Sequence, residues 1–219
     1  MKTNTPERSW RASPLKRAAD IGGAAVLFAV TAPVIATAAA AKWIEDRDNP
    51  FFVQRRSGRG GSTFPMFKIR TLHSGEHTGI GQGPDDQRAT RLGSFLRRYG
   101  IDELPQLANI LAGHMSFTGH RPAIEAEMKA IEEAHAEPQH QEAYAKWLGV
   151  LAAERPGIIS TYSIVTRFAP HDERDSDSYS RERVQIDIAD YEQASPLQDV
   201  KLAGQTVKLI GRVVMHNFS

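Results

Sequence analysis

An uncharged apolar run from Ile21 to Ala41 constrains this chain more than any other segment. At 1.5 Å per residue it makes about 31 Å of helix, enough to cross a bilayer core. Basic residues lie on both sides of the run, and Pro33 interrupts its second half. Because positive charges tend to stay in the cytoplasm, a simple span does not satisfy both flanks, whereas a re-entrant helix broken at Ala32–Pro33 does.

Two other interpretations of the run stay open. Its length alone is typical of a spanning helix, while the basic start and the small-residue stretch after Pro33 are typical of a cleaved secretory signal peptide. For the organisation of the chain we expect a basic segment over residues 1–20, a membrane-inserted re-entrant helix hairpin over 21–48, and a compact globular domain over 49–219.

Charge and cysteine content exclude several classes of protein. The net charge is +1, from 27 Lys and Arg against 26 Asp and Glu, so no global field attracts nucleic acid. There are no cysteines, which excludes a disulfide framework and thiolate metal sites. At 219 residues the chain is long enough for a domain with its own core in addition to an anchor.

The globular part is expected to be α+β and predominantly helical. Two short β-prone runs, 51–54 and 64–69, flank a glycine-rich loop and predict a β-hairpin. The loop carries Arg55, Arg56 and Arg59, which face either phosphates or solvent.

Helical patterns fill most of the remaining chain. Residues 91–99 and 195–215 predict amphipathic helices, which suit either a membrane interface or an ordinary surface. Residues 123–153 predict two helices broken at Pro138, with Glu127 and His135 on a solvated face.

The adjacent carboxylates Asp102 and Glu103 are the best candidates for chemistry. Gly100 permits a turn, Asp102 is a favoured N-cap type, and Pro105 would fall in the first helical turn, so the pair is predicted at a helix start. Side-by-side carboxylates suit Mg²⁺, and an ionised Asp is a nucleophile for a phosphoryl centre. The competing interpretation is an ordinary capped helix with no chemistry.

The stretch RRYGIDELPQLANILAGHMSFTGHRP resembles the signature of the bacterial sugar transferase family, the small monotopic phosphoglycosyl transferases. Two positions depart from the family pattern, because His114 replaces its usual Asp and His120 its usual Pro. The segment RPGI at 155–158 also matches, but it continues as ISTYSIVTR where the family often has TGWAQVNGR. The donor sugar therefore cannot be inferred.

The resemblance implies an enzyme at the cytoplasmic face of the bacterial inner membrane. It would move a sugar 1-phosphate from a UDP-sugar to polyprenyl (undecaprenyl) phosphate and release UMP, as the first membrane step of exopolysaccharide or other surface glycan assembly. Asp102 would be the nucleophile and would hold Mg²⁺ together with Glu103. The residues expected to bind substrate phosphates are Arg97, Arg121, Arg155, Lys68 and Arg70.

Two functions of other classes remain as alternatives. The departures at His114 and after Gly157 are compatible with a non-catalytic homologue that binds a lipid-linked intermediate or acts as a scaffold in glycan assembly. A cleaved signal peptide would instead make the chain a secreted soluble protein. A homodimer, or association with other glycan-assembly enzymes, is compatible with the sequence, which does not decide between them.

Overall fold

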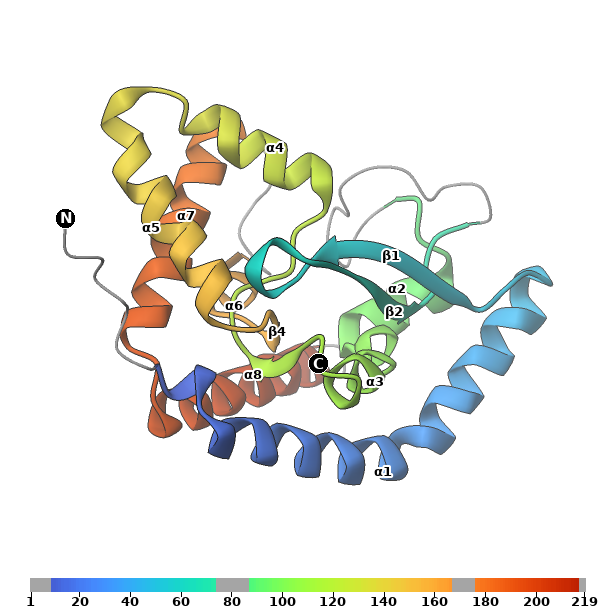
Figure 1. The fold of residues 1–219 in the computed structure, drawn as a ribbon. Coiled ribbons are helices and arrows are strands. Elements are labelled where there is room, and N and C mark those ends of the chain that lie inside the picture. Colours follow the sequence, from blue (N-terminus) through green and yellow to red (C-terminus); the bar gives the residue numbers. More distant parts are fainter. Residues whose placement is uncertain (1–8, 74–86, 167–175, 217–219) are drawn as a thin grey trace.

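The protein is described by a computed structural model over residues 9–73, 87–166 and 176–216, with side chains as far as residue 211. Helices predominate in these ranges and the strands are short (Figure 1), which confirms the predicted α+β, mainly helical class. In chain order the elements are η1 (Trp10–Ala12), α1 (Pro14–Asp46), β1 (Phe51–Ser57), η2 (Arg59–Gly61), β2 (Thr63–Ile69), α2 (Arg91–Tyr99), η3 (Ile101–Glu103), α3 (Gln106–Leu111), β3 (Ser116–Thr118), α4 (Glu125–Ala134), η4 (Pro138–His140), α5 (Gln141–Ala153), β4 (Gly157–Ile159), α6 (Thr161–Thr166), α7 (Ser176–Glu192) and α8 (Pro196–His216).

The long helix α1 is bent but unbroken, which corrects the predicted break at Ala32–Pro33. It begins at Pro14 rather than at residue 21, because the Ser13 hydroxyl accepts a hydrogen bond from the Lys16 amide at 3.1 Å and caps the helix. It stays helical through Pro33 and ends at Asp46. Figure 1 shows α1 changing direction partway along, so its two arms belong to one continuous helix. Proline removes one hydrogen bond and bends a helix that the neighbouring bonds still hold together.

The first half of α1 is built into the protein core. Ala24 is fully buried in a cluster with Phe64, Met66, Leu107, Ile110 and Met115. Asp20 accepts a hydrogen bond from the Ser116 hydroxyl at 2.7 Å and pairs with Lys16 at 2.7 Å. Cleavage after the small-residue stretch would remove these contacts, so the structure favours retention of the segment over a signal peptide.

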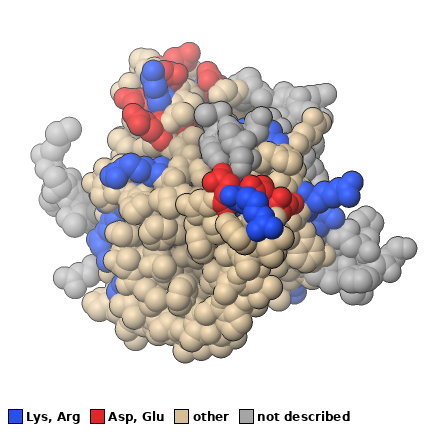
Figure 2. All heavy atoms as spheres, turned by 90° about the vertical axis from the view of Figure 1, so that its right-hand side faces the viewer, with Lys and Arg blue, Asp and Glu red and all other residues tan. Residues whose placement is uncertain are grey.

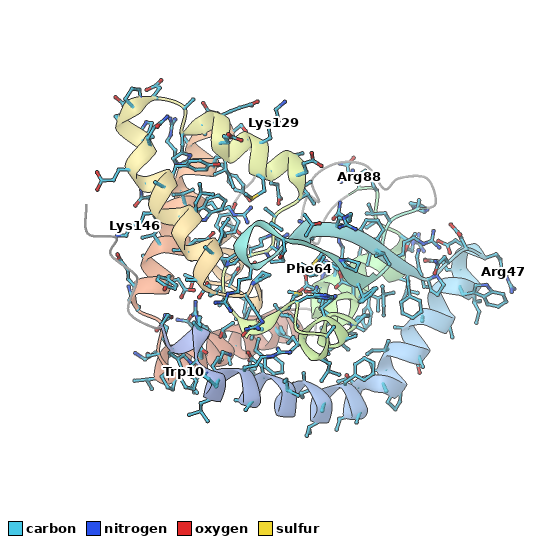
Figure 3. All side chains as sticks on the ribbon, in the orientation of Figure 1. Trp10, Arg47, Phe64, Arg88, Lys129 and Lys146 are labelled. Carbon is cyan, nitrogen blue, oxygen red and sulfur yellow. The ribbon has the colours of Figure 1, made fainter. Side chains whose placement is uncertain are left out.

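The predicted β-hairpin is confirmed. β1 and β2 pair antiparallel in a register that runs from Phe51 opposite Ile69 to Ser57 opposite Thr63. Phe64 and Met66 of β2 point into the core, and Phe64 lies in the middle of the molecule in Figure 3. One face of the hairpin is therefore fixed against α1 and α3.

A second core lies between α4, α5 and α7, the group at the upper left of Figure 1. Its centre is Trp147, whose side chain is fully buried and donates a hydrogen bond from Nε1 to Asp187 at 3.0 Å. The break at Pro138 is confirmed. The solvated face predicted for α4 is wrong at Glu127, which is mostly buried, and at His135, which is 2% exposed and bonds the Ile131 carbonyl at 2.7 Å.

A parallel strand pair joins the two halves of the chain. Ser116 of β3 lies opposite Gly157 of β4, and Thr118 lies opposite Ile159. The strands approach so closely that a Cβ on Gly157 would lie 2.3 Å from the Gly119 nitrogen. The pair thereby places the segment that ends at Arg121 beside the one that begins at Arg155.

The outer surface of α1 is apolar and uncovered. The helix is long and apolar enough to cross a membrane, and only 22% of its most apolar stretch is buried by protein. Figure 2 shows that the lower half of this side of the molecule, where α1 runs, carries few charged side chains. Exposed apolar side chains on α1 include Val26, Leu27, Val30 and Val34. An exposed apolar surface of this kind indicates membrane association.

Candidate active site

The acidic pair lies in the tight turn η3 between α2 and α3. Gly100 ends α2 in the left-handed conformation, with φ 69°, and η3 follows at once. The predicted capping is wrong: Asp102 lies inside η3, and Pro105 is the N-cap of α3, which begins at Gln106. The left-handed conformation of Gly100 ends α2 and lets η3 form directly after it. Asp102 and Glu103 therefore lie in η3, before α3, and do not cap α3.

A small polar cleft with an accessible volume of about 20 Å³ opens beside this turn. It brings together three of the predicted site residues, Lys68, Glu103 and Arg121. Asp102 is next to Glu103 in the chain but is only 6% exposed and is not among the lining residues. The residues that line the cleft are Arg56, Met66, Lys68, Glu103, Gln106, Arg121, Pro122, Gly157, Ile158 and Ser163.

Lys68 and Glu103 form an ion pair at the cleft. Lys68 Nζ lies 3.1 Å from Glu103 Oε1, and the two side chains are 19% and 32% exposed. Lys68 comes from β2 and Glu103 from η3, so the hairpin sets the position of the ammonium group. Lys68 thus balances the negative charge of Glu103, and the Glu103 carboxylate is still exposed enough to contact a ligand.

Arg121 reaches the cleft from the end of the β3 segment. Its Nη1 donates to the Ser163 hydroxyl at 3.3 Å. Ser163 lies in α6, where the Ser160 hydroxyl bonds its hydroxyl at 2.8 Å and accepts from its amide at 3.0 Å. The start of α6 therefore fixes one side of the Arg121 guanidinium.

The other three basic candidates do not line the cleft. Arg155 donates from Nε to the Gly113 carbonyl at 2.9 Å, and burial, with Arg17 and Arg59 nearby, lowers the pKa of its guanidinium. Arg97 is half-buried in the last turn of α2.

Arg70 is engaged at the C-terminal end of α1 instead. Its guanidinium lies 2.7 Å from Asp46 and 3.1 Å from Asp48, and its Nε donates to the Asn49 carbonyl at 2.8 Å. The side chain is 3% exposed. This geometry suits a structural clamp and does not favour phosphate binding.

The donor set around η3 fits Mg²⁺. Within the described ranges no cluster of three His, Asp or Glu side chains forms a ready-made cage, so a metal would rest on the Asp102–Glu103 pair. Mg²⁺ usually takes one or two carboxylates and completes its shell with water and substrate phosphate oxygens. A partly exposed carboxylate in a cleft with cationic walls meets that requirement.

The sequence analysis left some residues of the cleft undecided or unnamed. Arg56 was named with Arg55 and Arg59 as facing either phosphates or solvent, and the alternation of side chains along β1 is what places Arg56, but not Arg55, at the cleft. No motif or spacing in the sequence indicated that Gln106 or Ser163 would line the cleft. The two departures from the family pattern lie outside the cleft: His114 stacks on Phe64, and His120 is buried with its Nδ1 3.5 Å from Glu154.

Comparison with known proteins identifies the family. A sequence model described as bacterial sugar transferase matches residues 11–212. The UDP-glucose:undecaprenyl-phosphate glucose-1-phosphate transferase of Caulobacter vibrioides is 44% identical over 114 residues, which cover 49% of this chain and 41% of that protein. A putative undecaprenyl-phosphate N-acetylgalactosaminyl 1-phosphate transferase of Bacillus subtilis is 38% identical over 118 residues, 53% of this chain and 66% of its own length. The chain belongs to the bacterial sugar transferase family.

Proposed function

We propose that this protein transfers a sugar 1-phosphate from a UDP-sugar to undecaprenyl phosphate and releases UMP. The observation that carries the proposal is the cleft in which Glu103, Lys68 and Arg121 meet directly beside Asp102. The names of the Caulobacter and Bacillus proteins support an undecaprenyl phosphate acceptor. The apolar face of α1 supports membrane association, and the basic residues on both sides of the apolar run support a monotopic position on the cytoplasmic face of the inner membrane.

Asp102 is the nucleophile in the first step. One of its carboxylate oxygens attacks the phosphorus next to the sugar, the bond from that phosphorus to the bridging oxygen of the UMP group breaks, and UMP leaves with both bonding electrons. The product is a sugar phosphate joined to Asp102.

The lipid acceptor completes the reaction. A phosphate oxygen of undecaprenyl phosphate attacks the same phosphorus, the bond to the Asp102 oxygen breaks, and the carboxylate is regenerated. Mg²⁺, held by Glu103 with Asp102, would neutralise charge on the donor diphosphate and on the leaving UMP. Lys68 and Arg121 position the phosphates, so catalysis is largely positioning and electrostatic stabilisation.

The decisive measurement is UMP release by the purified full chain with undecaprenyl phosphate, Mg²⁺ and a panel of UDP-sugars. Asp102→Asn is expected to reduce turnover below detection with an unchanged melting temperature, because an amide oxygen is a poor nucleophile. The matched control is Asp177→Asn, a change at an exposed carboxylate in the first turn of α7, which is expected to keep full activity. Undiminished turnover in Asp102→Asn would refute the nucleophile assignment, and no UMP from any donor would favour a non-catalytic scaffold.

A further inference from the structure

Arg56 and Arg121 line one side of the cleft, and behind them the charges of Arg56, Arg121 and Arg183 all act on one carboxylate, that of Glu127. Glu127 Oε2 lies 3.4 Å from Arg56 Nη1 and 3.5 Å from Arg183 Nη1, and it accepts the Ile124 amide at 3.1 Å. Arg183 also donates to the Arg121 carbonyl at 2.6 Å. The Arg56 and Arg183 side chains are 12% and 3% exposed, so these charges are largely removed from water.

Positive charge exceeds negative charge in this cluster. The nearby carboxylates are Glu127, on which Arg56, Arg121 and Arg183 all act, and Asp187, 3.8 Å from Arg183. Asp187 also accepts the Trp147 Nε1 hydrogen bond at 3.0 Å, so its charge is shared between Arg183 and the indole. A buried cation that lacks a full counter-charge is costly unless a ligand supplies one. The cluster is therefore suited to an anion that enters from the cleft.

Arg56 has capacity left for such an anion. Its Nη1 makes two long contacts, to Glu127 and, at 3.2 Å, to the Pro122 carbonyl. Its Nε is buried and has no hydrogen-bond partner among the residues that the structure describes. Burial, with Arg121 and Arg183 acting in the same direction against Glu127 and Glu103, lowers the pKa of Arg56 to about 10, so the group stays protonated at neutral pH.

We propose that Arg56 and Arg121 form an anion subsite of the cleft that binds the diphosphate of the donor, and that Glu127 is the residue that positions Arg56. The inference rests on the proposed function, and it adds a substrate-binding residue and its support. Guanidinium groups match phosphate oxygens in pairs and keep their charge, which suits a diphosphate better than a neutral sugar hydroxyl. Lys68 and Glu103 lie in the same cleft, so the diphosphate is held between cations and the carboxylate that favours a metal.

The neighbouring residue on β1 provides a matched control. Arg55 is exposed on the opposite face of the strand and donates to the Thr63 hydroxyl at 2.6 Å. Arg55→Met removes one arginine from the same strand without touching the cleft. Arg56→Met removes the guanidinium from the cleft at nearly constant side-chain length.

The test is calorimetric titration of the detergent-purified full chain with inorganic pyrophosphate, with and without Mg²⁺. Arg56→Met is expected to weaken pyrophosphate binding by about 10- to 100-fold in both conditions, the range for losing charge-assisted hydrogen bonds. Arg56→Lys is expected to recover part of this loss, and Arg55→Met to bind as the wild type does. Glu127→Gln is expected to raise KM for the UDP-sugar several-fold with a smaller change in kcat.

Wild-type pyrophosphate affinity in a folded Arg56→Met variant would overturn the inference. Should that variant not fold, Arg56→Lys carries the test, because it keeps a charge near Glu127 but loses the paired donors; unchanged affinity there would also overturn it. The readout is separate from turnover. If pyrophosphate binding depends on Arg56 but the wild type releases no UMP, only the proposed function is contradicted. If the wild type releases UMP but the Arg56→Met variant binds pyrophosphate as tightly as the wild type, only this inference is contradicted.

Discussion

Glu127 lies on an Ala- and Glu-rich helix, yet its environment differs from that of its neighbours. Burial by itself would raise its pKa, but Arg183, Arg121 and Arg56, together with the Ile124 amide, outweigh burial and hold the pKa below 4.5. The sequence of α4 does not distinguish Glu127 from Glu132, which is exposed. The difference arises from arginines on β1 and α7, which are distant in the chain.

The lowered pKa predicts how stability depends on pH. Because the folded pKa of Glu127 lies below the unfolded value, its contribution is fully present above about pH 4.5 and is lost as pH falls through the folded pKa. Glu127→Gln is expected to lower the free energy of unfolding by about 1–3 kcal/mol at neutral pH and to flatten its decline in acid. Denaturant unfolding measured from pH 7 downward checks this, with Glu132→Gln as control. Equal acid slopes in the wild type and Glu127→Gln would contradict it.

The elements at the two ends of the chain are joined by a buried ion network. Arg11, which is 4% exposed in η1, lies 2.7 Å from Asp190 of α7, 3.1 Å from Asp199 of α8 and 3.5 Å from Glu154 after α5. Trp10 donates to Asp199 at 3.0 Å, and Figure 3 shows it where the start of the chain meets α8. The network fixes the N-terminal end of the membrane helix to the globular part.

Removal of the central cation should open this junction. Arg11→Met removes the cation shared by three carboxylates, of which Asp199 keeps Lys16 at 3.3 Å and Asp190 keeps the Thr161 hydroxyl at 2.8 Å, and we expect a loss of about 3–5 kcal/mol in the free energy of unfolding. Lys146→Met removes an exposed ion pair with Glu192 and is expected to cost less than about 1 kcal/mol. Denaturant unfolding in detergent compares the two variants. A stability of Arg11→Met within 1 kcal/mol of Lys146→Met would show that the network is not a clamp.

Local signals explain which elements were predictable. The hairpin, α2, the α4–α5 pair and α8 follow from apolar periodicity punctuated by glycine and proline, and these predictions are confirmed. The start of α1 at Pro14 was not predictable, because Lys16 and Asp20 look like the solvated flank of an apolar run. They are buried because Asp20 also bonds Ser116, almost a hundred residues away. The separate turn η3 around Asp102 was not predicted either. The left-handed conformation of Gly100 starts this turn, so α3 begins only at Gln106.

The composition of the cleft was also only partly predictable from the sequence. Glu103, Lys68 and Arg121 were predicted from motifs along the chain and do lie together. Arg70 belongs to a matching patch, but the acidic end of α1 engages its guanidinium. Ser163 enters the cleft only because β4 pairs with β3 and brings α6 alongside. Motifs along the chain selected the candidate residues, and long-range pairing decided which of their side chains share the cleft.

At the scale of the whole molecule, one apolar surface distinguishes this protein from a soluble domain. α1 runs along the lower edge of the molecule in Figure 1, and 22% of its most apolar stretch is buried among the residues that the structure describes. Val30 is 68% exposed on this surface, whereas Leu148 is 41% exposed on α5, away from α1. The two residues therefore separate the effect of a membrane contact from that of apolar exposure in general.

A charge on the α1 surface should release the protein from lipid. Burying a charged side chain in a bilayer costs about 2.5–3.5 kcal/mol on insertion scales, so Val30→Glu is expected to lower liposome partitioning by about 100-fold. Leu148→Glu should float with liposomes as the wild type does. Pyrophosphate binding by Val30→Glu in detergent is expected to persist, because the substitution is exposed and does not line the cleft. Wild-type flotation of Val30→Glu would mean that α1 does not lie in the bilayer, and the lipid acceptor would then have to reach the cleft without help from this helix.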